Sequence, residues 1–153
     1  MTTYKIREVK KEDLPDVLKL HENLWQEVYF SYDRFKEDLP DMQDFYPSGV
    51  FYVVESDVSG AIIGFGGLKI LSKGEARMKS IRIDPKYRNL GIARELIKKR
   101  EEFAQLKGIK KISLVISSLS YKALNLYKSL GYSIVKTKDV APDKKIYYLE
   151  RVL

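Results

Sequence analysis

At 153 residues and a net charge of +7, the chain has room for one domain with a single hydrophobic core. Hydrophobic residues make up 44% and charged residues 32%, and no apolar run approaches the roughly 18 residues of a membrane span. With no cysteine and one histidine, the sequence excludes a disulfide framework and predicts no metal site. We therefore expect one domain over residues 1–153 in the cytoplasm, with no membrane partner.

The hydrophobic pattern predicts the element order β-α-α-β-β-β-α-β-α-β-β. Strands are expected over residues 4–9, 50–55, 61–71, 75–84 and 111–116, with two more closing the chain. Helices are expected over residues 12–28, 33–42, 91–107 and 119–130. Pro85 ends the strand before it, and Gly108 is placed as a helix C-cap. This order predicts an α/β (α+β) fold with a mixed, mostly antiparallel central sheet flanked by helices.

The basic residues are concentrated in the middle of the chain. Residues 73–111 hold 13 Lys or Arg against 5 Asp or Glu, whereas residues 1–72 hold 8 against 13. Such a basic segment suits a polyanion, either a nucleic acid or a phosphorylated cofactor. No recognised nucleic-acid-binding motif is present, and Glu95, Glu101 and Glu102 interrupt the basic residues. We therefore expect no nucleic-acid partner.

The most informative segment, residues 78–94, runs from a predicted strand through a short turn into an amphipathic helix. The turn reads Arg88-x-x-Gly91-x-Ala93, and its small residues let the backbone approach a bulky anion. The free N–H groups at the helix start would face that anion, and Arg88 and Arg94 add positive charge. The segment is therefore a candidate phosphate cradle. The alternative is that Gly91 only relieves crowding at a helix start, beside solvated arginines.

Two other phosphate-binding classes are disfavoured, because the sequence has no Gly-x-x-x-x-Gly-Lys-Ser/Thr and no Gly-x-Gly-x-x-Gly after a strand. Instead, the turn resembles motif A of the GNAT N-acetyltransferase superfamily, Gln/Arg-x-x-Gly-x-Gly/Ala after the fourth strand. The segment from Ala123 to Tyr132 is similar to motif B of that superfamily, Ala-x-x-x-Tyr-x-x-x-Gly-Phe/Tyr. The similarity covers residues 50–135, and the element order extends it to the whole chain.

The resemblance implies direct transfer of an acetyl group from acetyl-CoA to a primary amine, with no covalent intermediate and no metal. It implies that the fourth strand binds the pantetheine arm through Ile81, Arg82 and Ile83. The pyrophosphate would be held by the turn and the helix start: Arg88, Asn89, Leu90, Gly91, Ile92, Ala93 and Arg94. Tyr127 would line the cofactor and act as general acid, although its helical spacing also fits a core aromatic. The family often has Gly where Asn89 stands, and Asn where the candidate cofactor contact Ser120 stands.

The general base is less closely defined by the resemblance. Some relatives use a Glu on the fourth strand, but Arg77 stands at the matching position. Glu75 lies two residues earlier on the same strand face and is the candidate catalytic base. The other interpretation of Glu75 is a solvated strand-end residue. A water chain to Glu27 or Glu55 remains open. The ribosomal-protein branch has a Glu where Val115 stands, which argues against membership of that branch.

The acceptor side is expected at the first helices, as in the superfamily. Residues 12–44 hold ten Asp or Glu against three Lys or Arg, which would attract a cationic amine. Aromatic residues in this part of the chain are candidates for the pocket wall or for the core: His21, Trp25, Tyr29, Phe30, Tyr32, Phe45 and Tyr46. We therefore expect a small cationic amine as acceptor. The alternatives are a protein N-terminal or lysine acetyltransferase acting on a peptide amine, and a non-catalytic acyl-CoA-binding module. The chain could be a monomer or a homodimer.

Overall fold

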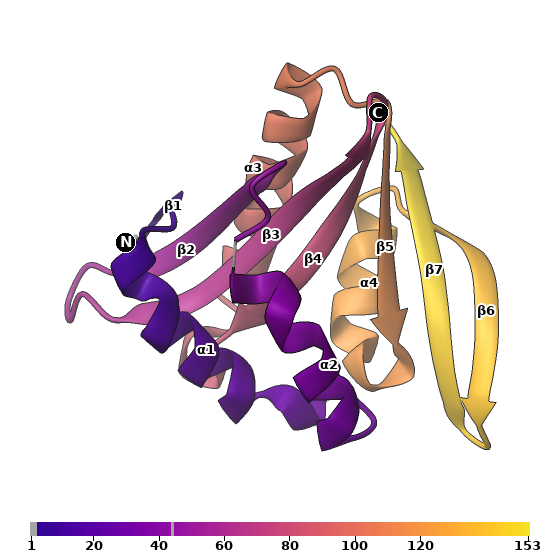
Figure 1. Ribbon diagram of the computed structural model, residues 1–153, viewed down its shortest axis with the longest axis horizontal. Coiled ribbons are helices and arrows are strands. Elements are labelled where there is room, and N and C mark those ends of the chain that lie inside the picture. The colour runs from indigo at the N-terminus through magenta and orange to yellow at the C-terminus, as the bar shows by residue number, and fades with distance from the viewer. Residues whose placement is uncertain (1–2, 44) are drawn as a thin grey trace.

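The computed structural model describes residues 3–43 and 45–153. Over these residues the strands form one seven-stranded sheet with helices on both faces (Figure 1). The strands are β1 (Tyr4–Glu8), β2 (Val50–Ser56), β3 (Ile62–Ser72), β4 (Glu75–Ile83), β5 (Lys111–Ser117), β6 (Ser133–Ala141) and β7 (Lys144–Val152). The α-helices are α1 (Leu14–Asn23), α2 (Tyr32–Gln43), α3 (Ile92–Leu106) and α4 (Tyr121–Ser129). Short 3-10 helices are η1 (Lys11–Asp13), η2 (Trp25–Glu27), η3 (Pro85–Tyr87) and η4 (Ser118–Ser120). The predicted order of strands and α-helices is confirmed.

The sheet is mixed and mostly antiparallel, as the sequence predicts. Its strand order is β1-β2-β3-β4-β5-β7-β6, and β4 and β5 are the one parallel pair among the described strands. α3 supplies the long crossover that a parallel pair requires. The pairing covers only Glu75 to Arg77 on β4 and Lys111 to Ser113 on β5. Beyond it the two strands diverge, as Figure 1 shows, so the sheet opens in its middle.

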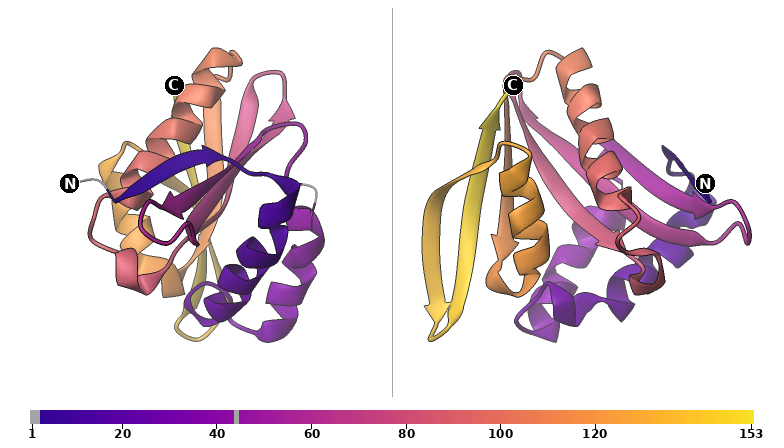
Figure 2. Two further views of the ribbon diagram at one scale, coloured as in Figure 1. Left: turned by 90° about the vertical axis from the view of Figure 1, so that its left-hand side faces the viewer. Right: turned by 180° about the vertical axis from the view of Figure 1, so that it is seen from behind.

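Helices cover both faces of the sheet, with α1 and α2 on one face and α3 and α4 on the other (Figure 2). β2 therefore has buried residues on both of its faces. Val54 belongs to a core that includes Leu96 of α3. The adjacent Val53 points to the opposite face and belongs to a second core that includes Val17 of α1. One core therefore packs helices against each face of the sheet.

The structure corrects the predicted long first helix. α1 ends at Asn23, and the following turn is the separate 3-10 helix η2. The carbonyl oxygens of Glu27 and Val28 accept hydrogen bonds from Ser120 Oγ at 3.0 Å and from Ser117 Oγ at 2.7 Å. These bonds from η4 and the end of β5 hold the segment after α1 beside the open part of the sheet. The apolar stripe could not show the break, because these contacts come from residues about 90 positions later in the chain.

β4 carries a β-bulge beside the opening. Beyond the pair formed by Gly67 and Lys79, one residue of β3 stands opposite two residues of β4, Ser80 and Ile81. Ser80 has a φ of 56°, which is unusual for a residue other than glycine. A bulge bends its strand and changes the direction of the side chains near it, and bulges are frequent next to active sites. The bulge therefore marks this part of β4 as a place to look for function.

Candidate functional site

Two pockets meet where β4 and β5 separate. The α3 pocket, of about 600 Å³, is lined by β4, the start of α3 and α4. The α2 pocket, of about 420 Å³, is lined by α2, β4 and β5. Both volumes lie in the range of small-molecule sites. Six residues line both pockets: Val28, Ile81, Arg82, Ser120, Ala123 and Tyr127. The pockets are therefore adjoining halves of one cleft.

The turn before α3 gives the α3 pocket a wall suited to an anion. Gly91 is the N-cap of α3 with a φ of 82°, and a Cβ placed on it would meet nothing within 4 Å. Asn89 is also left-handed, with a φ of 64°. No side chain of the described residues caps this helix, and Ile92 and Ala93 of its first turn line the pocket. The free N–H groups and the positive end of the helix dipole are therefore available to a phosphate group.

The structure places almost all of the predicted cofactor-binding residues around the α3 pocket. Its lining includes Ile81, Arg82, Ile83, Arg88, Asn89, Gly91, Ile92, Ala93, Arg94, Ser120 and Tyr127. Leu90 is 55% exposed and is not part of the lining. Residues from β4, α3 and η4 therefore meet at one pocket, while the role of each residue toward a cofactor stays a prediction.

Arg88 stabilises the turn rather than pointing freely into the pocket. Its Nε and Nη2 atoms donate hydrogen bonds to the carbonyl oxygen of Ile83 at 3.2 and 3.0 Å. Nη2 also forms an ion pair with Glu27 Oε1 at 2.6 Å. This ion pair connects η2 to the turn before α3. A phosphate bound at the turn would compete with Glu27 for the guanidinium.

Tyr127 stands at the junction of the two pockets. Its ring is 3% exposed and packs edge-on against Tyr132, with 5.2 Å between ring centroids. Its hydroxyl oxygen accepts a hydrogen bond from Arg100 Nη2 at 3.3 Å. Tyr127 is among the lining residues of both pockets, so its side chain lies where the two halves of the cleft meet. This position suits a group that exchanges a proton with a bound reactant.

The α2 pocket carries charges of both signs. Glu37 and Asp38 of α2 line it, and Arg34 donates to Glu37 Oε2 at 3.1 Å across one helical turn. Basic residues from β4 also line this pocket: Arg77, Lys79 and Arg82. Of the ten acidic residues of segment 12–44, only Glu37 and Asp38 are among the lining residues that the structure describes. The acidic excess of that segment is therefore not carried over to the described lining of the pocket, which has more basic than acidic residues.

Tyr29 links Asp38 to Arg82 on the wall of the α2 pocket. Its hydroxyl donates a hydrogen bond to Asp38 Oδ2, and Arg82 Nη2 donates to the same hydroxyl at 3.5 Å. Burial raises the pKa of Tyr29, and burial also lowers the pKa of Arg82 from its usual value. Arg82 Nε is buried without a hydrogen-bond partner among the described residues. These three side chains form a connected polar group on the wall of the α2 pocket.

His21 is a core residue and lines neither pocket. It is fully buried, and its ring lies against those of Tyr29, Phe35 and Phe65 at centroid distances of 5.0 to 5.9 Å. Burial lowers the pKa of His21 to about 3, with a further contribution from the charge of Arg82. The imidazole is therefore neutral at physiological pH.

Glu75, the candidate base, lies away from both pockets. It stands at the paired start of β4, opposite Lys111 of β5. Its carboxylate forms an ion pair with Lys111 Nζ at 3.3 Å, and it lines neither the α3 pocket nor the α2 pocket. Glu75 therefore lies at the end of β4 that is paired with β5, whereas the cleft lies beyond Arg77, where the two strands separate. Its catalytic role stays a prediction, without geometric support.

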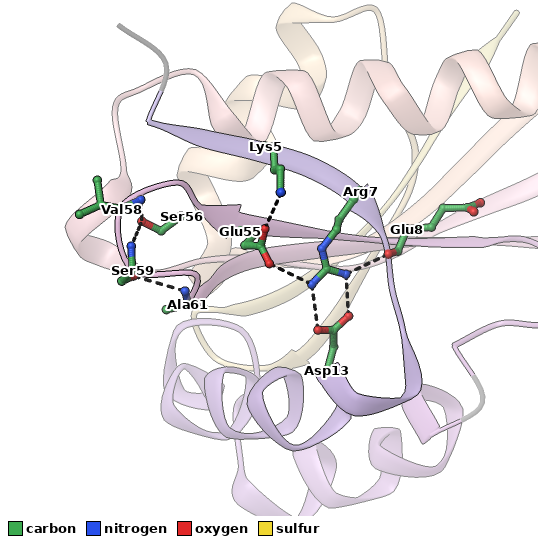
Figure 3. A network of polar contacts seen from close by, with 9 residues as sticks. All are labelled: Lys5, Arg7, Glu8, Asp13, Glu55, Ser56, Val58, Ser59 and Ala61. Atoms are coloured by element: carbon green, nitrogen blue, oxygen red, sulfur yellow. Dashed lines mark hydrogen bonds and ion pairs between the residues drawn. The ribbon is translucent and has the colours of Figure 1, made fainter.

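The two other carboxylates considered for the base are also engaged. Glu55 on β2 binds Lys5 Nζ at 3.0 Å and Arg7 Nη2 at 3.4 Å, and Arg7 also binds Asp13 (Figure 3). The hydrogen bond from Lys5 holds the pKa of Glu55 below its usual value. Glu55 lines neither pocket. Glu27 lines the α3 pocket, but it is paired with Arg88 as described above.

The aromatic residues expected near the acceptor divide into two groups. Tyr29 and Phe30 line the α2 pocket. Trp25, Tyr32, Phe45 and Tyr46 are not part of its lining and pack against other rings. Sequence reasoning missed further lining residues and one buried neighbour: Arg34, Glu37, Asp38, Lys79 and Arg100. The spacing of the three α2 residues could have indicated a shared helix face. A charged residue within the apolar stripe of α3 could likewise have drawn attention to Arg100.

Comparison with known proteins assigns the family. The chain matches the model of the acetyltransferase (GNAT) family over residues 14–132. It is 30% identical over 139 residues to thialysine N-epsilon-acetyltransferase of Bos taurus, which covers 82% of each chain. It is 26% identical over 132 residues to N-acetyltransferase family 8 member 3 of Rattus norvegicus, covering 78% of this chain but only 57% of that relative. The chain belongs to the GNAT acetyltransferase family.

A solved structure shows the same fold at lower sequence identity. The PaiA N-acetyltransferase of Thermoplasma acidophilum, in complex with coenzyme A, matches with a TM-score of 0.82 and 18% identity, over 99% of this chain and 100% of that chain. The GNAT-like fold inferred from the two motifs is therefore confirmed. Within residues 3–43 and 45–153, no cluster of three or more His, Asp or Glu could hold a metal ion. No helix in the same ranges is long and apolar enough to cross a membrane.

Proposed function

We propose that the chain transfers the acetyl group of acetyl-CoA directly to the primary amine of a small cationic molecule, without an acetylated enzyme intermediate. The α3 pocket would hold coenzyme A, and the α2 pocket would hold the amine. Membership of the GNAT family and the N-acetyltransferase names of the relatives support this class of reaction. One of these relatives is named for an amine, the ε-nitrogen of thialysine.

The residues around the α3 pocket fit coenzyme A. The open turn at Gly91 and the uncapped start of α3 suit its pyrophosphate. The pairing of β4 with β5 ends at Arg77, so the later part of β4, through Ile83, has no β5 partner and could bind an extended pantetheine arm in the manner of an added strand. The arm would have to displace the side chains of Arg82 and Arg88 from the carbonyl oxygens of Ile81 and Ile83. Ser120 lines the pocket, but its hydroxyl donates to the carbonyl oxygen of Glu27. The helix start and the β4 backbone are therefore the main cofactor contacts in the proposal.

The observation that carries the proposal is the position of Tyr127 between the two pockets. Attack of an amine on the thioester carbonyl breaks the C–S bond and leaves the electron pair on sulfur. Tyr127 would give its hydroxyl proton to that sulfur, because a thiol with a pKa near 8.5 leaves more readily when a proton donor meets the developing charge. The hydroxyl would recover a proton from the attacking nitrogen or from water.

In the proposed mechanism a carboxylate of α2, rather than Glu75, binds the protonated amine and takes its proton. An alkylamine has a pKa near 10 and is mostly protonated at neutral pH. Glu37 and Asp38 line the α2 pocket and suit such a cation, whereas Glu75 lines neither pocket. One of these carboxylates, directly or through water, would take the proton that the amine must lose before it attacks.

The proposal is tested by following release of free coenzyme A in the presence of a panel of amines. The panel contains diamines, amino acids with a side-chain amine, amines with neutral tails, and peptides with a free N-terminus or a lysine. Acetylation of a small cationic amine, with an unchanged intact mass of the protein during turnover, is the expected result. Preference for the peptides would make the chain a protein acetyltransferase. Binding of acetyl-CoA without transfer to any amine would contradict an enzymatic function.

A further inference from the structure

Arg100 of α3 is a guanidinium buried in the centre of the molecule. It is 0% exposed, whereas the other basic residues of the same helix, Arg94, Lys98 and Lys99, are exposed. Its Nη1 donates to the carbonyl oxygen of Gly67 at 2.9 Å, and its Nε donates to that of Leu96 at 3.2 Å. A Cβ placed on Gly66 would lie 3.2 Å from Arg100 Cζ, so the absence of a side chain there makes room for the guanidinium.

The charge of Arg100 is not paired with a carboxylate in the described part of the chain. The adjacent Glu101 instead binds Arg151 Nη1 at 2.5 Å and accepts a hydrogen bond from Tyr132 at 2.8 Å. A buried charge without an opposite partner opposes folding, and an apolar side chain of similar size would avoid that cost. Packing alone therefore does not explain an arginine on the apolar stripe of α3.

Two further contacts of the guanidinium are a long one from Nη1 to the carbonyl oxygen of Lys79 at 3.5 Å and one to a side chain, and the side-chain contact gives the arginine a reason. Nη2 donates to the Tyr127 hydroxyl oxygen at 3.3 Å. Because this bond occupies an oxygen lone pair, the Tyr127 hydroxyl hydrogen is directed elsewhere, and among the described residues it has no acceptor. Tyr127 is among the lining residues of both pockets, so a hydroxyl hydrogen that Arg100 leaves without an acceptor can be given to a molecule bound beside it. When that proton leaves, the negative charge left on the oxygen lies next to the guanidinium.

We propose that Arg100 is a positioning residue that directs the Tyr127 hydroxyl hydrogen into the cleft and stabilises the phenolate formed when Tyr127 protonates the departing thiolate. This inference rests on the proposed function and deepens it. In the step concerned, the C–S bond breaks, sulfur takes the electron pair and then the Tyr127 proton, and the negative charge stays on the Tyr127 oxygen. The proton given up by the attacking nitrogen restores the hydroxyl, so the charge is balanced over one turnover.

The test is a double-mutant cycle between the two positions, with kcat measured at saturating acetyl-CoA and amine. Arg100→Met removes the charge and the donor, and should lower kcat about tenfold or more in the protein that keeps Tyr127. In the Tyr127→Phe background the same substitution should change kcat less than about twofold, because the group through which it acts is gone. Lys98→Met, an exposed position on the same helix, is the matched control and should leave kcat unchanged.

A structural role for Arg100 gives a different pattern. Arg100→Met would then lower kcat by the same factor in both backgrounds, or not at all, and either result overturns the inference. If Arg100→Met does not fold, Arg100→Gln keeps hydrogen-bond donors, loses the charge and takes its place in the cycle.

A second test uses the acetyl thioester of a thiophenol as the acetyl donor, because its thiolate leaves without a proton. With this donor the Arg100 variant and the unsubstituted protein should react at the same rate. Unequal rates with this donor would also overturn the inference.

Failure of the inference can be told apart from failure of the proposed function. If Tyr127→Phe keeps full kcat, Tyr127 is not the acid and the proposed mechanism fails before Arg100 is considered. If Tyr127→Phe is impaired and Arg100→Met is not, only the role of Arg100 is wrong. Thermal unfolding of each variant, recorded without substrate, separates loss of folded protein from loss of rate.

Discussion

The two halves of the cleft are built in different ways. The α3 pocket takes its candidate phosphate wall from one continuous segment, the turn and helix start from Arg88 to Arg94, and much of it is backbone. The α2 pocket is assembled from residues of six separate parts of the chain, including Asp38 of α2, Arg82 of β4 and Ser117 of β5. A backbone wall for a phosphate can be common to a family, whereas a wall of assembled side chains can differ from protein to protein. We expect changes in the first half to alter cofactor binding and changes in the second to alter acceptor choice.

The largest expected effect comes from Tyr127, one of the six residues that line both halves. Tyr127→Phe removes one oxygen atom and keeps the ring that packs against Tyr132. We expect kcat to fall on the order of 10²-fold or more with little change in KM, because the hydroxyl acts while the thiolate develops. Tyr132→Phe is the matched control, since Tyr132 is equally buried but its hydroxyl donates to Glu101 and it lines neither pocket. Equal losses in the two variants would place Tyr127 among the core aromatics.

The next effect tests the backbone wall of the α3 pocket. Gly91 has a φ of 82°, where a β-branched residue is strained by roughly 1–2 kcal/mol or more, so Gly91→Val should distort the turn. Acetyl-CoA should then bind on the order of tenfold more weakly, and the rise in melting temperature that it causes should shrink or disappear. Gly108→Val is the control, because Gly108 has a φ of 75°, has open space around it and follows the other end of α3. A full acetyl-CoA shift in the Gly91 variant would contradict the phosphate cradle.

The third prediction concerns the acid stability of the acceptor half. The pKa of His21 is lowered from 6.5 to about 3 in the folded protein, so the unfolded chain binds its proton first as the pH falls. The contribution of neutral His21 to stability is therefore complete above pH 6.5 and is lost progressively between pH 6.5 and pH 3. The free energy of unfolding should fall by up to about 1.4 kcal/mol per pH unit more in the unsubstituted protein than in His21→Leu.

Urea unfolding at pH 7.5, 5.5 and 4.5 measures this difference. Above pH 7 the two proteins should show the same pH dependence, which serves as the internal control. Parallel loss of stability down to pH 4.5 would mean that His21 is protonated in the folded protein.

The smallest expected effect concerns the charge of the α2 pocket. Several acidic residues of the segment 12–44 are already paired, Asp13 with Arg7, Glu27 with Arg88 and Glu37 with Arg34. Long-range attraction of a cationic amine should therefore be modest, with kcat/KM falling roughly twofold to threefold more than for a neutral-tailed amine as salt rises. Asp38→Asn should reduce this difference, while Asp57→Asn, on the turn between β2 and β3, should not. The same salt dependence of kcat/KM for both amines would contradict long-range attraction of the cationic amine.

The sequence was most informative where the structure is local. The order of strands and helices and the segment 78–94 could be predicted, because a strand, a turn and a helix start follow one another in the chain. The path of the chain after α1 could not, since Ser117 and Ser120 bind the carbonyl oxygens of Val28 and Glu27 from about 90 positions later in the chain. Glu75 was a reasonable candidate from strand alternation, but alternation does not tell at which end of β4 the sheet opens.

The roles of Arg100 and of the side chains that line the α2 pocket could not be predicted from local sequence patterns for the same reason. Asp38 becomes part of the pocket only because α2 packs beside the open part of the sheet, and its partner Tyr29 comes from the broken segment after α1. Arg100 gains its meaning from Gly67 on β3 and Tyr127 on α4, which lie 33 and 27 positions away. Contacts across the sheet decide these roles, and a single sequence does not display them.

A crystal structure with acetyl-CoA bound would test the central claim most directly, because it locates the thioester sulfur relative to both pockets. We predict that the pyrophosphate lies at the turn containing Gly91 and that the sulfur lies roughly 3–4 Å from the Tyr127 hydroxyl oxygen, with the acetyl group facing the α2 pocket. A cofactor bound outside the cleft, or a sulfur too far from Tyr127 for one hydrogen bond or one bridging water, would contradict the proposed transfer between the two pockets.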